Sequence, residues 1–113
     1  MSRLEITVRD AATGSVLEVA GDLDHVTAHD LRTRITGLPL RPDQCLVVDL
    51  AGLAFCDSSG LTALLVARAH AHGARADIVL TGVPANTLRV MRIVGLDQVF
   101  TLRPDADGAA GHP

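Results

Sequence analysis

The residues with the clearest chemical potential form the run 57–61, Asp-Ser-Ser-Gly-Leu, which follows an apolar segment. We expect a helix to begin in this run, and a helix N-terminus leaves backbone amides unpaired and carries partial positive charge. A serine there can cap the helix, or it can carry a phosphate that these amides stabilise. A second acidic run, Gly-Asp-Leu-Asp at 21–24, lies between another predicted strand and helix. Taken alone, each run is also explained by helix capping, in the second case by Asp24.

The serines do not fit a hydrolase. The nucleophile of such an enzyme sits in a G-x-S-x-G elbow with a histidine base in reach, whereas Ser58 follows Cys56 and Asp57. His25 and His29 have the i, i+4 spacing of one helix face, but no cysteine or carboxylate cluster completes a metal site by sequence spacing. No Gly-x-Gly-x-x-Gly motif marks a dinucleotide site. We therefore expect no catalytic residue, no metal and no cofactor.

The composition indicates one small globular domain. The chain has 113 residues, of which 48% are hydrophobic, and this is enough for one core without disulfides or metals. The net charge is −3 and aromatic residues make up 2%, which argues against nucleic-acid binding through phosphate neutralisation or base stacking. No apolar run approaches the roughly 18 residues of a membrane span, and the N-terminus is charged where a signal peptide would be apolar. We expect a cytoplasmic protein that binds neither nucleic acid nor membrane.

The first part of the chain predicts a β-hairpin followed by a helix. Apolar and polar residues alternate at 4–8, a second strand follows at 16–20, and the turn at 11–15 joins them. The run 21–24 then breaks the strand pattern. Apolar spacing of four predicts a helix over 26–35.

The rest of the chain alternates strands with helices. A nearly continuous apolar run at 45–50 predicts a central strand that is buried on both faces. The next helix would bury Leu61, Leu64 and Leu65 on its apolar face. The remaining predicted elements are a helix over 58–72 that ends at Gly73, a strand at 77–80, a helix from Val83-Pro84 to Gly95 with Leu88, Met91 and Val94 facing inward, and a strand at 99–102.

This order of elements predicts the α/β class. Strands that alternate with helices give a mixed, mostly parallel sheet with right-handed crossovers, an N-terminal hairpin and helices packed against the sheet. We expect a single domain over residues 1–103. Residues 104–113 are rich in Pro, Asp, Gly and Ala, and we expect them to form a flexible C-terminal tail.

Together, the two acidic runs and their places in this order resemble the STAS-domain family, and within it the stand-alone anti-sigma factor antagonists of bacteria. The resemblance covers about residues 4 to 102. The residues that carry it are 21–25, 27–28, 31–32, 47–50, 55, 57–61, 95–97 and 99–100.

The resemblance implies a regulatory switch in which the antagonist is a phosphoprotein and not an enzyme. Such antagonists bind an anti-sigma factor that is itself a serine kinase of the GHKL type, and this partner switching releases a sigma factor for transcription. The kinase phosphorylates the first serine after the aspartate, here Ser58, and the phosphorylated antagonist no longer binds. A PP2C-type phosphatase resets it. Partner contacts are expected at Asp22, Asp24, Asp57, Ser58, Ser59, Gly60 and Leu61.

The sequence departs from the family pattern at two places. Cys56 stands where a larger aliphatic residue is usual, and we expect it to pack as a small hydrophobe. We expect both Cys56 and Cys45 to be buried free thiols rather than a disulfide pair. The family domain commonly ends in a C-terminal helix, which residues 104–113 look unable to form, and this puts in doubt any partner contact made by that helix.

The same resemblance allows a second interpretation of the function. STAS-like modules also act as non-switching adaptor subunits in stress-signalling or lipid-transport assemblies, and some members have been proposed to bind nucleotides. An adaptor does not need a phosphorylatable serine, so the complete Asp-Ser-Ser-Gly-Leu context at 57–61 favours the switch. The sequence leaves open whether the protein is a monomer or a weak dimer.

Overall fold

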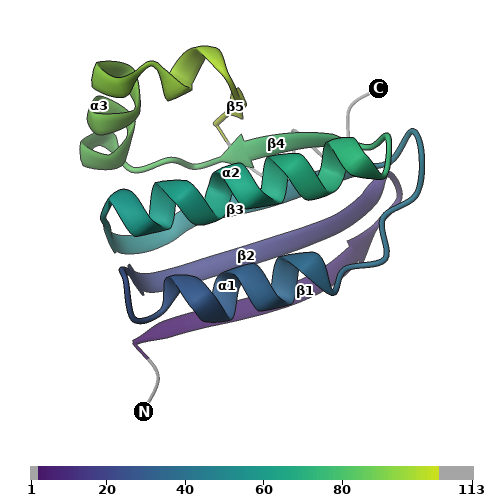
Figure 1. The fold of residues 1–113 in the computed structure, drawn as a ribbon, viewed down its shortest axis with the longest axis horizontal. Coiled ribbons are helices and arrows are strands. Elements are labelled where there is room, and N and C mark those ends of the chain that lie inside the picture. The colour runs from purple at the N-terminus through teal and green to yellow at the C-terminus, as the bar shows by residue number, and fades with distance from the viewer. Residues whose placement is uncertain (1–2, 105–113) are drawn as a thin grey trace.

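The computed structural model describes residues 3–104, which form a five-stranded sheet with helices α1 and α2 side by side across one face and α3 beside its β4–β5 end (Figure 1). The elements are β1 (Leu4–Ala11), β2 (Gly14–Leu23), α1 (Ala28–Thr36), β3 (Cys45–Cys56), α2 (Ser58–Gly73), β4 (Asp77–Thr81), α3 (Ala85–Val94), the short 3-10 turn η1 (Leu96–Gln98) and β5 (Thr101–Arg103). The predicted tail falls almost entirely on residues 105–113, which lie outside the described residues.

The strands follow one another across the sheet in the order β1-β2-β3-β4-β5. β1 and β2 are antiparallel, and each of the other neighbouring pairs is parallel. This confirms the predicted class: a mixed, mostly parallel sheet with an N-terminal hairpin. Because β2, β3 and β4 run parallel to one another, their carboxyl ends lie at the same end of the sheet.

The main core fills the space between the sheet and α1 with α2. Alternate residues of β3, Leu46, Val48 and Leu50, are fully buried in it. From the helices, Leu31 and Leu64 are equally buried. Alternation in the strand and spacing of three to four in the helices thus bring apolar side chains to one layer.

Three strands run at least three residues further than their patterns predict. β1 continues to Ala11 instead of ending at residue 8, so the predicted turn at 11–15 is confined to the residues between Ala11 and Gly14. β2 continues through the run 21–24 as far as Leu23, and β3 ends at Cys56 rather than at residue 50. The register between β2 and β3 shifts twice, between Glu18 and Ala20 and between Gly21 and Asp22. Each shift places one extra residue in β3 and interrupts the period-two alternation of that strand, so its sequence pattern stops while the pairing continues. The prediction that the run 21–24 breaks the strand is therefore wrong.

Gly21 supports this extension. Its φ is +101°, and a Cβ there would overlap the carbonyl oxygen of Arg3. Only glycine combines this backbone conformation with so close an approach of β1.

Several predicted helix details need correction. Gly73 is the last residue of α2, Ala74 takes the cap position predicted for Gly73, and the positive φ of +58° falls at Arg75. Leu65 and Val94 were expected to face inward, but 37% and 58% of their surfaces are exposed, because each lies outside the buried arc of its helix. Met91 is buried as predicted.

Three predicted boundaries also shift by one or two residues. α1 begins at Ala28 instead of residue 26, and Pro84 precedes α3 instead of lying within it. The last strand lies at Thr101–Arg103 instead of 99–102, because η1 and a turn occupy the residues up to Phe100. Within residues 3–104, no helix is both long and apolar enough to cross a membrane.

Candidate functional site

The two acidic runs meet at one end of the sheet. Asp22 lies opposite Phe55 and Leu23 lies opposite Cys56 in the β2–β3 ladder. The Asp57 amide then donates a hydrogen bond to the carbonyl oxygen of Leu23 at 3.1 Å. The turn into α1 and the start of α2 are therefore neighbours, at the left end of the molecule in Figure 1.

Asp57, and not a serine, caps α2. Its backbone is extended, and its Oδ1 accepts hydrogen bonds from the amides of Ser59 at 2.9 Å and Gly60 at 3.1 Å. Two of the amides left over at the helix N-terminus are thereby satisfied by a carboxylate, which also suits the positive end of the helix dipole. Ser58 is the first helical residue and is exposed. Its hydroxyl group is not needed for the cap.

The next two residues of the run lie beneath the surface. Gly60 is buried, and a Cβ added to it would lie 2.7 Å from the Cys56 Sγ and 2.8 Å from the Leu23 Cγ. Leu61 is 7% exposed. The glycine thus allows the first turn of α2 to lie directly on the ends of β2 and β3. These two residues hold the turn in place, while Ser58 faces solvent.

Asp24 closes the other turn with a reciprocal set of hydrogen bonds. Its Oδ1 accepts from the amides of Val26 at 2.9 Å and Thr27 at 3.0 Å, and its own amide donates to the Thr27 Oγ1 at 2.9 Å. Its Oδ2 forms an ion pair with Arg3 at 2.8 Å. This reciprocal pair has the form of a capping box but closes the turn ahead of α1. The N-cap of α1 is Thr27, which makes no side-chain cap hydrogen bond, so the prediction that Asp24 is the N-cap of this helix is wrong. Asp24 is buried, whereas Asp22 is half-buried.

These contacts favour the ionised form of Asp24. The hydrogen bond from the Thr27 amide is the largest cause that lowers the pKa of Asp24 below its ordinary value, and the Val26 amide and the Arg3 charge act in the same direction against burial. A carboxyl group whose pKa is lower in the folded state stabilises the fold above its unfolded pKa, and this contribution is lost as the pH falls through the folded pKa.

Replacing Asp24 with Asn tests this link. Asparagine can still cap the turn but has no charge for Arg3, so we expect Asp24→Asn to have a lower Tm than the unmodified protein at pH 7. The difference should narrow as the pH falls from about 4, the ordinary pKa of an unfolded aspartate, toward the lower pKa of Asp24 in the folded state. Thermal melts of both proteins between pH 7 and pH 3 measure it. A difference that stays constant over this range would contradict an electrostatic role for Asp24.

The family is shown by comparison with known proteins. The family model described as "Mlab, STAS domain" matches residues 6–104. The chain belongs to the STAS-domain family. A STAS-domain containing protein of Pseudomonas aeruginosa is 30% identical to this STAS domain over 101 residues, with 88% of this chain and 99% of the relative covered. The anti-sigma-F factor antagonist RsfB of Mycobacterium tuberculosis is 29% identical over 99 residues, with 88% and 80% covered.

Solved structures agree in fold. An anti-sigma factor antagonist from Mycobacterium paratuberculosis is 28% identical to this STAS domain, with a TM-score of 0.76 and 96% and 95% of the two chains covered. The unphosphorylated form of the anti-sigma factor antagonist SpoIIAA has the same TM-score of 0.76 at 17% identity, with 96% and 99% covered, and this likeness concerns the fold alone.

The two cysteines of the STAS domain are free and half-buried. This confirms unpaired thiols, but they are less deeply buried than predicted. Burial first, and the charge of Asp57 second, raise the pKa of Cys56 to about 11. Burial and Asp77 likewise raise the pKa of Cys45. Both thiols therefore stay protonated and weakly nucleophilic near neutral pH. Within the described part of the chain, no group of three or more His, Cys, Asp or Glu side chains is placed to hold a metal ion.

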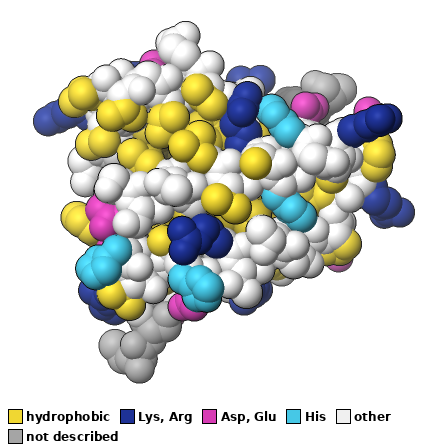
Figure 2. Space-filling view, in the orientation of Figure 1, with side chains coloured by type: hydrophobic (Ala, Val, Ile, Leu, Met, Phe, Trp, Pro, Cys, Tyr) yellow, Lys and Arg dark blue, Asp and Glu magenta, His cyan; other side chains and the backbone are white. Residues whose placement is uncertain are grey.

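Apolar side chains are exposed next to the site and on α3, and the sequence did not predict their exposure. Phe55 is 50% exposed and Val26 59% exposed, one at the end of β3 and one in the turn ahead of α1. On α3, Val90, Ile93 and Val94 are exposed. Figure 2 shows apolar side chains gathered over α3 and the neighbouring part of α2. The exposure on α3 could have been inferred from the sequence of this helix, because its apolar residues occupy more than one helix face.

Proposed function

We propose that this STAS domain is an anti-sigma factor antagonist that binds an anti-sigma serine kinase and is switched off by phosphorylation of Ser58. The observation that carries the proposal is the exposed position of Ser58 in the first turn of α2, beside a carboxylate that supplies the helix cap. The mycobacterial relatives named as anti-sigma factor antagonists support the same class. Release of a sigma factor is then the consequence of binding, and this chain carries no catalytic role.

A phosphate at Ser58 would act on binding rather than on folding. It adds about −1.5 to −2 charges at pH 7, next to Asp57 and at the end of the sheet where Asp22 lies. The helix N-terminus tolerates an anion, so the fold keeps its stability. An interface must instead desolvate the phosphate beside these carboxylates. A penalty of about 4 kcal/mol weakens binding about a thousandfold.

Exposure divides the site residues into those that can contact a partner and those that hold the two turns in place. We propose that Asp22, Asp57, Ser58 and Ser59 lie in the partner-binding surface. Asp24, Gly60 and Leu61 are buried and contribute by holding the two turns in place. The exposed side chains of Phe55 and Val26 provide apolar surface at the same end of the sheet. A polar rim around exposed aromatic and aliphatic side chains is the usual composition of a protein interface.

The proposal includes the remaining parts of the switch. The partner is a GHKL-type kinase, a PP2C-type phosphatase removes the phosphate, and the cycle takes place in the cytoplasm.

A pull-down from native lysate tests the dependence of kinase binding on residue 58, with the unmodified protein, Ser58→Asp and Ser58→Ala as baits and mass spectrometry as the readout. We expect the unmodified and Ser58→Ala baits to recover a kinase that Ser58→Asp does not. Addition of ATP to the recovered complex should place phosphate on Ser58 alone.

A second function remains open because of one finding. The matching family model is described by an Mlab STAS domain rather than by an anti-sigma factor antagonist. A non-switching adaptor subunit, in a stress-signalling or lipid-transport assembly, would use the same surface without phosphorylation. Equal recovery of one non-kinase partner by all three baits would support the adaptor and reject the switch.

A further inference from the structure

The two edges of the sheet are built differently. β5 has three residues, and so short an edge offers little to a neighbouring chain. β1 has eight residues, contains no proline, and pairs with β2 in unbroken register from Leu4 to Ala11. A long, regular edge strand is a template for pairing with a further strand.

The hydrogen bonds to β2 show which groups of β1 face the open edge. The Asp22 amide donates to the carbonyl oxygen of Arg3 at 2.8 Å, so the pair of Arg3 and Asp22 is a hydrogen-bonded one. Such pairs alternate along an antiparallel ladder. Residues 5, 7 and 9 therefore bond to β2, and the backbone groups of Ile6 and Val8 point to the edge.

The central residues of β1, 5–9, are complementary to one another about Thr7. In an antiparallel pair of two β1 strands centred on Thr7, Ile6 lies opposite Val8 of the second copy and Glu5 lies opposite its Arg9. The apolar pair falls on one face of the sheet and the oppositely charged pair on the other, and symmetry doubles each. Charges on an edge strand usually prevent pairing, but here their order makes the antiparallel copy attractive. Arg9 already contacts Glu18 at 3.3 Å, so Glu5 of the second copy would join an existing ion pair.

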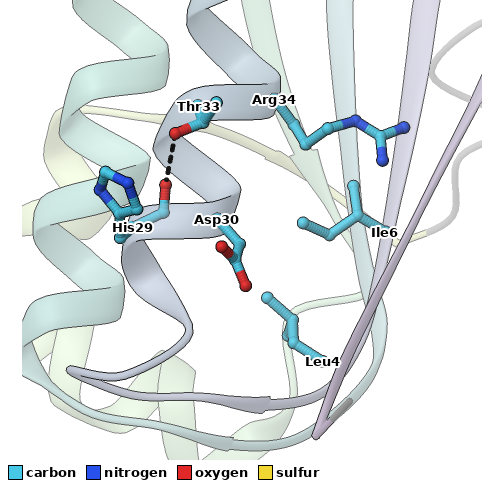
Figure 3. Close-up of a pocket in the computed structure, with 6 residues that line it drawn as sticks. All are labelled: Leu4, Ile6, His29, Asp30, Thr33 and Arg34. Atoms are coloured by element: carbon cyan, nitrogen blue, oxygen red, sulfur yellow. Dashed lines mark hydrogen bonds between the residues drawn. The ribbon is translucent and has the colours of Figure 1, made fainter. Parts of the chain in front are cut away.

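A hollow beside the β1 edge offers space for the paired side chains of Ile6 and Val8. It measures about 410 Å³ and lies between β1 and α1, with Leu4 and Ile6 on the strand side. Figure 3 shows Ile6 pointing into this space, with Asp30 and Arg34 on the helix. Ile6 and Val8 are each half-buried in the single chain. A second β1 strand would cover both of them.

We propose that two copies of this chain associate through their β1 strands, antiparallel about Thr7, so that the two sheets become one continuous sheet. Pairing of one edge strand buries less than the roughly 1,200 Å² of a standard interface, so the dimer is weak, with a dissociation constant in the micromolar range or above. The surface lies at the β1 edge and the inference does not depend on the function of Ser58.

Cysteine cross-linking tests the register. The two copies of Thr7 would form a directly opposed pair that is not hydrogen-bonded, with Cα atoms about 4.5 Å apart, which is within the range for a disulfide. Glu5→Cys is the matched control, because residue 5 is also exposed and on the same face, but its two copies would lie about 13 Å apart along the strand. Under mild oxidation we expect Thr7→Cys to form at least about ten times more covalent dimer than Glu5→Cys. Equal amounts from the two variants would overturn the proposal.

Sedimentation velocity tests the association without a covalent bond. Over about 1 µM to 1 mM protein we expect the unmodified chain to dimerise, and Glu5→Arg to dimerise about tenfold more weakly because two Arg-Arg pairs replace two ion pairs. The double variant Glu5→Arg/Arg9→Glu should restore dimerisation, provided that thermal melts show both variants folded. An unmodified chain that stays monomeric, or a double variant as weak as the single one, would reject this pairing and leave the edge to a strand of another protein.

Discussion

We expect Ser58→Asp to weaken binding to the proposed anti-sigma partner by up to about a thousandfold, the loss argued for a phosphate, and to leave the Tm within a few degrees of that of the unmodified protein. The large effect on binding follows from a carboxylate placed beside Asp57 in a surface that must lose water on association. The small effect on folding follows from the cap, since the two hydrogen bonds that hold the start of α2 end on Asp57 and not on Ser58. Isothermal calorimetry with the purified partner and a thermal melt measure the two quantities.

Ser58→Ala is the control for this result. It removes the hydroxyl group without adding charge, so it should bind like the unmodified protein and be resistant to ATP-dependent release. If Ser58→Asp unfolds the domain, residue 58 has a structural role and the assignment of the site is wrong. If Ser58→Asp binds as well as Ser58→Ala, the site does not act as a charge switch.

The second large effect concerns stability. Leu64 is fully buried in the core between α2 and the sheet. Leu64→Ala should lower the free energy of unfolding by about 3 kcal/mol, within the range of about 2 to 5 kcal/mol for leucine truncations in cores. For a domain of this size the Tm then falls by about 15 °C. Urea denaturation and a thermal melt measure the change.

Leu65 supplies the matched control. It is the next residue of the same helix, with 37% of its surface exposed. Leu65→Ala should cost less than about 1 kcal/mol, because the change leaves no closed cavity. Similar losses for the two variants would mean that the buried face of α2 is assigned to the wrong residues.

The order of elements could be predicted because the buried layer follows simple periods. Leu46, Val48 and Leu50 lie in an apolar run, and Leu31 and Ile35 are four residues apart, so strand and helix can be told from spacing. The ends of β2 and β3 could not be predicted in this way. Their last residues stay paired across two shifts of register, and such pairing depends on the neighbouring strand rather than on local sequence.

The meeting of the two acidic runs at one end of the sheet was predictable, but the separate roles of their residues were not. The runs 21–24 and 57–61 each follow a strand, and parallel neighbours bring those ends together. Asp and Ser are both favoured N-cap residues, so the sequence could not decide between Asp57 and Ser58. The decision depends on β3 ending at Cys56, which places Asp57 in the extended conformation that a cap requires. The exposure of Val94 could not be predicted for a related reason. It depends on how α3 packs against the rest of the fold and not on the local sequence.

The limited packing of α3 has a consequence for the motions of the molecule. Only Thr87 and Met91 of this helix are buried, whereas α2 buries six residues along its length. Segments that bury few side chains open at a lower free energy than the whole domain unfolds. The backbone amides of α3 should therefore exchange with solvent deuterium well before those of α2. A partner that covers Val90, Ile93 and Val94 would slow that exchange. The exchange rate of the α3 amides would then show whether a partner is bound to the outer face of this helix, while the rest of the fold stays unchanged.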